Sequence, residues 1–167
     1  RKPGMDLSGT TALVTGANRG IGRALTEALA ARPLRLVLAG VRDPDSFEPI
    51  PNVRAIRMDL SSRESIDECA DAIDEPVDLL INNAGQMTGG LLEEQDMDAV
   101  YAMFQVNLVG VAHLTSRLLP GMLERGRGTI VNNASISGYA YFPAASTYAA
   151  SKAGVVALTE SLRRELD

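Results

Sequence analysis

The chain has 167 residues, of which 46% are hydrophobic and 22% charged, and its formal net charge is −5. This length and composition indicate one globular domain and exclude a disordered chain. The negative charge argues against nucleic acid as a partner, because phosphate binding favours a basic surface. Cys69 is the only cysteine, so an internal disulfide is excluded, which fits a reducing cytoplasm. No apolar run reaches the roughly 18–20 residues that span a bilayer, so we expect no membrane partner and a cytoplasmic location.

Apolar runs suited to buried strands alternate with amphipathic helical patterns along the chain. We predict strands at 12–15, 34–39, 53–58, 77–82 and 128–133. Apolar residues three and four positions apart predict helices over 21–29, 66–73 and 100–118, and another from about Ser146 to the end of the chain. Alternating strands and helices indicate an α/β fold, in which a parallel sheet is covered by helices on both faces.

The two ends of the chain lead to separate predictions, one about a continuation past Asp167 and one about the origin of residues 1–6. The last predicted helix runs to Asp167 and leaves the fifth predicted strand at an edge of the sheet. Because a long apolar edge strand promotes aggregation, we expect the natural protein to continue. Residues 1–6 are interpreted as an N-terminal extension, and residues 1–4 within it as a cloning remnant, since Met5 begins a natural-looking segment.

The first predicted strand runs into a glycine-rich loop, TGANRGIG at residues 15–22, and a helix follows. Gly16 permits a tight turn, Gly20 lets the backbone approach a pyrophosphate, and Gly22 lets the helix pack against the strand. The N–H groups and positive dipole end of the helix would bind the phosphates. The alternative is an ordinary strand–helix turn. The expected cofactor contacts in this loop are Gly16, Asn18, Arg19, Gly20, Ile21 and Gly22.

The end of the second predicted strand bears on which dinucleotide would bind. Dinucleotide folds often carry an acidic residue there for the ribose 2′-hydroxyl of NAD, but Val41 occupies the expected position and Arg42 follows it. The guanidinium groups of Arg19 and Arg42 could clamp a 2′-phosphate, which favours NADP(H) over NAD(H). Two alternatives stay open: both arginines are solvated surface charges, or an alignment shifted by two residues makes Asp43 an NAD-type carboxylate.

A second motif, NNAG at residues 82–85, ends the fourth predicted strand. Asparagine side chains at a strand end can tie neighbouring strands together, and Gly85 lets backbone lie against a cofactor. A bland turn is the alternative. We expect Asn83, Ala84 and Gly85 to contact the cofactor.

Tyr148 and Lys152 are four residues apart on the last predicted helix, so their side chains face the same way. Reducing a carbonyl requires a proton donor beside a hydride donor. A free tyrosine holds its proton tightly, with a pKa of about 10, and a nearby ammonium group stabilises the phenolate. Ser135, just past the fifth predicted strand, can hydrogen-bond the substrate oxygen and oppose charge build-up there. A lone tyrosine and lysine at this spacing would be more typical of a solvated helix face.

Taken in order, these motifs resemble those of the classical short-chain dehydrogenase/reductase family, including its Asn-Ser-Tyr-Lys tetrad. The matching tetrad positions are Asn107, Ser135, Tyr148 and Lys152. The resemblance implies a Rossmann-type doubly wound parallel sheet in three layers. It also implies that Lys152 holds the nicotinamide ribose, and that Asn107 holds a water that relays protons through Lys152. Asp59-Leu60 resembles the family's adenine-contacting pair, although Asp59 is equally explained as a helix N-terminal acid.

The resemblance covers residues 7–167 and implies an NADP(H)-binding domain that lacks the usual C-terminal strands and substrate lid. The function it implies is hydride transfer between NADP(H) and a ketone or secondary alcohol, with Tyr148 as general acid and base. The alternative is a non-catalytic NADP(H)-binding or regulatory protein on the same fold. The expected partners are a small carbonyl or alcohol substrate and further copies of the chain in a homodimer or homotetramer. No metal site is expected.

Several other side chains leave their roles open on sequence alone. Met87, Tyr139, Tyr141 and Phe142 follow the motifs, and they either line a substrate pocket or pack within their loops. Cys69 shares a helix face with apolar residues and is expected to pack there. His113 has no matching ligands nearby in the sequence, so we expect it to have a structural or interface role and not to bind a metal.

Overall fold

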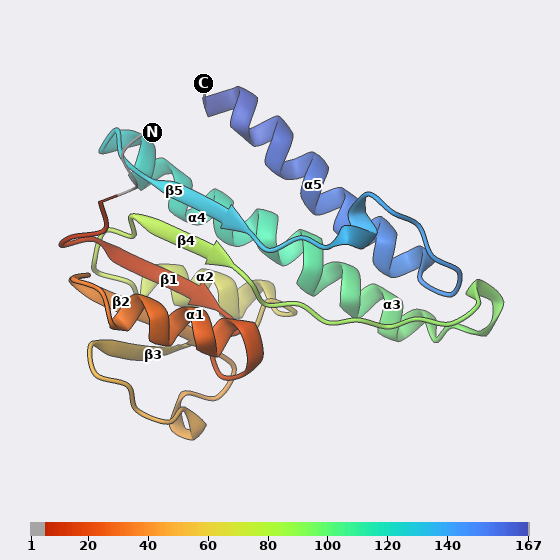
Figure 1. Cartoon of the computed structure of the whole chain (residues 1–167), viewed down its shortest axis with the longest axis horizontal. Coiled ribbons are helices and arrows are strands. Elements are labelled where there is room, and N and C mark those ends of the chain that lie inside the picture. The colour runs from red at the N-terminus through yellow and green to blue at the C-terminus, as the bar shows by residue number, and fades with distance from the viewer. Residues whose placement is uncertain (1–5, 167) are drawn as a thin grey trace.

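The computed structural model describes residues 6–166, and the interpretation of residues 1–4 as a remnant lies outside them. Five parallel strands form one sheet in the order β3-β2-β1-β4-β5 (Figure 1). The strands are β1 (Thr11–Thr15), β2 (Leu36–Val41), β3 (Val53–Arg57), β4 (Leu79–Asn82) and β5 (Thr129–Asn132). All five predicted strands are present, although the second lies at Leu36–Val41 and not at 34–39, and the doubly wound parallel sheet is confirmed.

Between residues 6 and 166, five α-helices connect and cover these strands: α1 (Gly20–Ala30), α2 (Arg63–Asp71), α3 (Met97–Phe104), α4 (Gly110–Glu124) and α5 (Ser146–Leu166). Short 3₁₀ turns lie at Pro44–Ser46, Leu92–Glu94 and Ile136–Gly138. Within the described residues, no helix is both long and apolar enough to cross a membrane.

Each face of the sheet packs its own hydrophobic core, because successive side chains of a strand point to opposite faces. On one face, Val14 and Val37 pack with Leu29 of α1. On the other, Leu13 packs with Ile66 of α2 and Leu114 of α4. Both faces of the central strands are thereby buried, which explains why their sequences are continuously apolar.

The predicted helix over 100–118 is real but not continuous. A π-helical turn, Gln105–Val109, separates α3 from α4 and contains the buried Asn107. Side-chain periodicity could not reveal this turn, because the apolar face continues through it. π-helical turns inside α-helices occur frequently at functional sites.

The fifth strand lies at the edge of the sheet, as the sequence predicts, and Val131 on it is 44% exposed. Helix α5 follows it, begins beyond the carboxyl ends of the strands and runs back on the β5 side of the sheet (Figure 1).

Cys69 and His113 both have structural roles, as expected. Cys69, on α2, is buried in the core, and burial raises the pKa of its thiol to about 11. The His113 Nε2 atom lies 3.0 Å from Oδ1 of Asp67, which joins α4 to α2.

Candidate functional site

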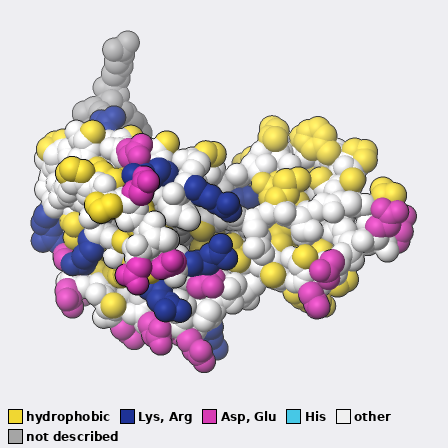
Figure 2. Space-filling model, turned by 90° about the horizontal axis from the view of Figure 1, so that it is seen from below, with side chains coloured by type: hydrophobic (Ala, Val, Ile, Leu, Met, Phe, Trp, Pro, Cys, Tyr) yellow, Lys and Arg dark blue, Asp and Glu magenta, His cyan; other side chains and the backbone are white. Residues whose placement is uncertain are grey.

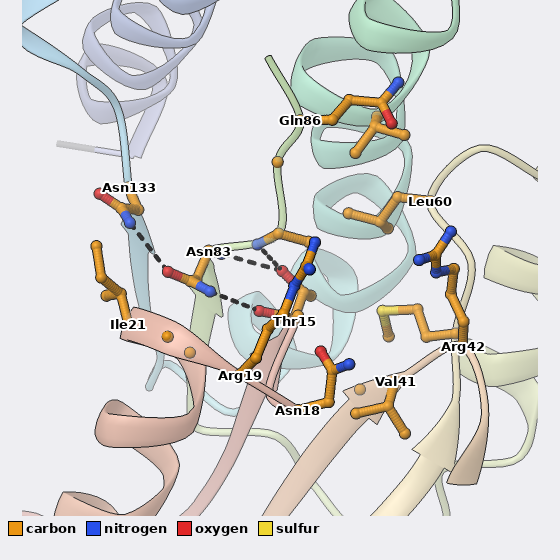
Figure 3. A pocket seen from close by; sticks show the side chains of 18 of the residues that line it. Thr15, Asn18, Arg19, Ile21, Val41, Arg42, Leu60, Asn83, Gln86 and Asn133 are labelled. Carbon is orange, nitrogen blue, oxygen red and sulfur yellow. Dashed lines mark hydrogen bonds between the residues drawn. The ribbon is translucent and has the colours of Figure 1, made fainter. Parts of the chain in front are cut away.

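A cavity of about 790 Å³ lies where all five strands end, and the loops after those strands line it (Figure 3). In open α/β sheets, ligands bind outside these carboxyl ends. Among the residues expected to contact a cofactor or do chemistry, the following line this one cavity: Gly16, Asn18, Arg19, Gly20, Ile21, Gly22, Arg42, Asp59, Leu60, Asn83, Ala84, Gly85, Tyr148 and Lys152. Segments that are up to 136 residues apart in the chain (Gly16 to Lys152) therefore share one site.

The glycine loop has backbone requirements that only glycine meets easily. Gly16 and Gly20 have φ values of +66° and +54°, in the left-handed region. A Cβ atom on Gly16 would lie 2.9 Å from Cα of Ala84. At Gly22, a Cβ atom would overlap the Gly16 carbonyl and lie 2.5 Å from Nδ2 of Asn83. The first turn of α1 is thus packed directly against the NNAG segment.

Asn83 ties three strand ends together. The Thr15 hydroxyl oxygen accepts hydrogen bonds from the N–H groups of Asn83 and Ala84, at 3.0 and 2.9 Å. The Asn83 side chain donates to the Thr15 carbonyl at 3.1 Å and accepts from Nδ2 of Asn133 at 2.9 Å (Figure 3). The tying role expected of an asparagine at this strand end is confirmed, and it fixes the floor of the cavity.

Positive charge gathers at the end of the cavity beside β2 and β3. Arg19 and Arg42 are exposed there, and neither forms a salt bridge within the described part of the chain. Burial acts to raise the pKa of Asp59, but hydrogen bonds from Ser61 and the charges of Arg42 and Arg57 outweigh it and lower that pKa. Asp59 therefore carries its negative charge beside Arg42.

Asp43 also lines this end, but its carboxylate caps the turn that follows β2. Oδ1 of Asp43 accepts a hydrogen bond from the Asp45 N–H at 3.2 Å. That contact gives Asp43 a local structural role.

Tyr148 and Lys152 occupy the opposite end of the cavity, on adjacent turns of α5. Tyr148 is half-buried, whereas Lys152 is only 7% exposed. The Lys152 ammonium donates to the Asn133 carbonyl at 3.1 Å. Burial removes water from this ammonium and lowers the pKa of Lys152. The lysine is therefore held in place by β5 and directed at the cavity.

Asn107 and Ser135 do not line the cavity themselves. The Ser135 hydroxyl oxygen accepts from the Ser137 N–H at 3.2 Å, and Ser135 directly follows Ala134, which does line the cavity. Asn107 is buried beneath it. A Cβ atom on Gly85 would lie 3.3 Å from Asn107 Oδ1 and 3.6 Å from Lys152 Nζ, so these two polar atoms border the same small space.

The Asn107 side chain is held by an unpredicted partner, Ser151. Asn107 donates to the Gln86 carbonyl at 2.9 Å and to the Ser151 hydroxyl at 3.1 Å, and it accepts from the Gln86 N–H at 2.9 Å. The Ser151 hydroxyl in turn donates to the Tyr148 carbonyl at 2.8 Å. The π-helical turn and α5 are thereby linked at the site. In the sequence, Ser151 is marked only by its place next to Lys152. Its hydrogen bond with Asn107 becomes visible only in the folded structure.

Comparison with known proteins gives a consistent assignment. Residues 10–167 match the short chain dehydrogenase family. An uncharacterized oxidoreductase from Staphylococcus saprophyticus is 33% identical, over 97% of this chain and 74% of the relative. A short-chain dehydrogenase structure from Streptomyces avermitilis has a TM-score of 0.88 at 36% identity, over 97% of this chain and 62% of that one. An alcohol dehydrogenase from the archaeon Thermococcus sibiricus, complexed with 5-hydroxy-NADP, has a TM-score of 0.87 at 28% identity, over 93% of this chain and 71% of that one.

The fold and the sequence match define an oxidoreductase with a Rossmann-type sheet. The chain belongs to the short-chain dehydrogenase/reductase family. It spans less than two thirds of the Streptomyces structure.

Proposed function

We propose that the protein transfers a hydride between NADP(H) and a ketone or secondary alcohol, with Tyr148 as general acid and base. The observation that carries this proposal is the single cavity, which the glycine loop borders at one end and Tyr148 with Lys152 at the other. Family membership supports the reaction class, and the arrangement of the cavity supports the assignment of roles.

The residues present fit a dinucleotide. The cradle at Gly16 and Gly22 leaves no room for a Cβ atom, so it presents bare backbone to the cavity at the start of α1. Backbone N–H groups at a helix N-terminus bind phosphates well. When bound, NADP(H) supplies or accepts the hydride. Asp59 and Leu60 would contact the adenine side, and Asn83, Ala84 and Gly85 would support the nicotinamide side together with Lys152.

Tyr148 transfers the proton in this proposal. In reduction, the Tyr148 hydroxyl would give its proton to the carbonyl oxygen, and in oxidation the Tyr148 phenolate would take the proton of the alcohol. Ser135 donates a hydrogen bond to the same oxygen. Lys152 would hold the ribose hydroxyls and place positive charge beside the phenol. The space between Asn107 Oδ1 and Lys152 Nζ is suited to a water that passes protons onward.

The proposal favours NADP(H) over NAD(H) because of the charges beside β2. Arg19 and Arg42 line the cavity without salt bridges among the described residues, and a 2′-phosphate would supply the missing anion. Asp43, the candidate for an NAD-type carboxylate, already caps the following turn. The neighbour solved with 5-hydroxy-NADP is consistent with this preference.

The experiment is an assay of NADPH oxidation by the protein expressed from its complete coding sequence, across a panel of ketones and aldehydes. We propose that the complete protein adds further strands and a substrate lid after this domain, so the complete form is the one to assay. Carbonyl-dependent loss of NADPH absorbance is expected. Tight NADPH binding without oxidation by any carbonyl would contradict the enzymatic role and favour a non-catalytic binding protein.

We further propose a homodimer or homotetramer in the cytoplasm. Val109 at the end of the π-helical turn and Leu123 on α4 expose apolar side chains that a second copy could cover. The buried Cys69 thiol is consistent with a reducing compartment. Mass measurement in solution tests the assembly, and a monomer at micromolar concentration would contradict it.

A further inference from the structure

The loop that follows β2 is a compact turn that forms one side of the cavity. Arg42, Asp43 and Ser46 on this loop line the cavity. Within the turn, the Ser46 hydroxyl donates to the Asp43 carbonyl at 2.9 Å, and the Phe47 N–H donates to the Pro44 carbonyl at 3.1 Å. The Phe47 side chain is 9% exposed and packs into the core. Because these contacts hold the turn together, whatever fixes its far end also fixes Arg42 at its start.

Arg23, in the first turn of α1, connects this loop to the glycine loop. The Arg23 N–H donates to the Arg19 carbonyl at 3.2 Å. The guanidinium group of Arg23 lies 5.1 Å from the centre of the Phe47 ring and donates to the Glu48 carbonyl at 3.1 Å. The Glu27 carboxylate accepts from Nε of Arg23 at 2.7 Å and so holds the guanidinium group in this orientation. One residue therefore bridges the two segments that border the proposed 2′-phosphate site.

Charge alone does not distinguish Arg23 from other residues of this region. Figure 2 shows Lys and Arg side chains beside Asp and Glu side chains on the face of the molecule that lies lowest in Figure 1, where β3 and the loop after β2 are found. Arg54 of β3, for example, forms an ion pair with Glu75 away from the cavity. Arg23 differs because its guanidinium group also binds loop backbone and covers a buried aromatic ring. Its removal would free the loop as well as a charge.

From these contacts, and resting on the proposed function, we propose that Arg23 is a positioning residue that strengthens the preference for NADPH over NADH. Arg23 does not itself line the cavity, so it acts on the cofactor through the loop. A loop that is held in advance spares NADPH the cost of ordering Arg42 when it binds. NADH lacks the 2′-phosphate and gains nothing from an ordered Arg42. The contacts of Arg23 therefore favour one cofactor over the other, which a merely stabilising residue would not do.

The test measures the Kd values of NADPH and NADH by calorimetry with the complete protein. Arg23→Met keeps an apolar stem and removes the guanidinium group. We expect it to raise the NADPH Kd about fivefold and to leave the NADH Kd within about twofold of the wild-type value. Arg54→Met is the matched control, because it removes an ion pair on β3 without touching the loop, and it should change neither Kd. If Arg23→Met raises both Kd values equally, or changes neither, the inference is wrong.

Arg23→Lys separates position from charge and is the milder change to the fold. A lysine keeps the positive charge but lacks the guanidinium fork that reaches both Glu27 and the Glu48 carbonyl. We expect the preference for NADPH to fall nearly as far as in Arg23→Met. A wild-type preference in Arg23→Lys would mean that the charge acts on the phosphate through space, and would overturn the positioning role.

A double-mutant cycle identifies the side chain through which Arg23 acts. In an Arg42→Ala background, Arg23→Met should leave the ratio of the two Kd values unchanged, because the side chain that the loop positions is gone. A further fall of about fivefold in that background would show that Arg23 acts independently of Arg42, against the inference. The proposed function fails in a different way: wild-type protein that binds NADPH no more tightly than NADH would refute the cofactor assignment before any variant is compared.

Discussion

The two ends of the cavity are built on different principles. At the end beside β1 and β2, backbone does the positioning: Gly16 and Gly20 adopt left-handed angles, and Gly22 packs without room for a Cβ atom. At the end beside α5, side chains do it: Lys152 is anchored to Asn133, and Asn107 is anchored to Gln86 and Ser151. The first end is lined by the charged residues Arg19, Arg42 and Asp59, whereas Lys152 is the charged residue that lines the second. The difference matches an anionic cofactor at one end and an uncharged reacting group at the other.

The largest effect should come from adding a methyl group at the backbone-built end. Gly22→Ala places a Cβ atom against the Gly16 carbonyl and Asn83, which must shift the loop. We expect the NADPH Kd to rise at least about 100-fold, or ~2.8 kcal/mol. Gly126→Ala is the control and should leave the NADPH Kd unchanged, because a Cβ atom there meets nothing within 4 Å at a similarly strained φ of +60°, and Gly126 does not line the cavity. Equal NADPH affinity in Gly22→Ala and the wild type, with folding intact by circular dichroism, would refute this view of the loop.

Removing charge at the same end should change the choice of cofactor. Arg42→Ala is expected to lower the preference for NADPH over NADH by about 30-fold, since a charge-assisted bond contributes roughly 1.5–3 kcal/mol. The ratio of Kd values for the two cofactors is the measurement. Arg57→Ala removes a nearby exposed arginine that does not line the cavity, and it should leave the ratio near that of the wild type. A ratio unaffected by Arg42→Ala would mean that this arginine is merely a solvated charge.

At the side-chain-built end, Ser151 is a positioning residue, and its loss should have an intermediate effect. Ser151→Ala removes an acceptor from the buried Asn107 amide and a donor to the Tyr148 carbonyl. We expect kcat to fall about tenfold, which corresponds to ~1.4 kcal/mol, with the NADPH Kd unchanged and the pH profile of kcat displaced. Ser161→Ala changes an exposed serine of the same helix and should alter none of these quantities. A fall in stability without a change in the pH profile would indicate a purely structural role.

The smallest expected effect is a gain in stability. Burial lowers the pKa of Lys152. At neutral pH its ammonium group is charged in both states, but it is hydrated in the unfolded chain and loses that hydration in the folded one. Lys152→Met should therefore raise the free energy of unfolding by about 1 kcal/mol at pH 7 while abolishing activity. The gain should shrink as the pH rises through the folded-state pKa of Lys152 and vanish above the unfolded-state pKa, because both states are then neutral. Urea unfolding across this range, with the exposed Arg164→Met as control, checks the trend; a gain that grows with pH would contradict it.

The backbone-built end was largely predictable from sequence, because glycine spacing and continuous apolar strands specify it locally. The second strand nevertheless begins at Leu36 and not at Leu34. Leu34 is buried, as its apolar character predicts, but the pairing with β1 starts only at Thr11↔Leu36. The strand ends at Val41, and Arg42 directly after it lines the cavity, as expected from the sequence.

The side-chain-built end was only partly predictable. The residue types of the tetrad were visible, but the hydrogen bonds that hold the Asn107 side chain reach Gln86, 21 residues earlier in the chain. The exposure of Tyr141 and Phe142 likewise depends on how two distant loops pair. Local patterns carry no record of such long-range contacts.

The most direct test of the division between the two ends is Tyr148→Phe in the complete protein. Tyr148 carries the chemistry in this account but adds little to cofactor binding. We therefore expect the rate of NADPH-dependent ketone reduction to fall by roughly 10²–10⁴-fold, while the NADPH Kd measured by calorimetry stays within about twofold of the wild-type value. Undiminished reduction by Tyr148→Phe would contradict the account, as would a loss of NADPH affinity large enough to explain the loss of rate.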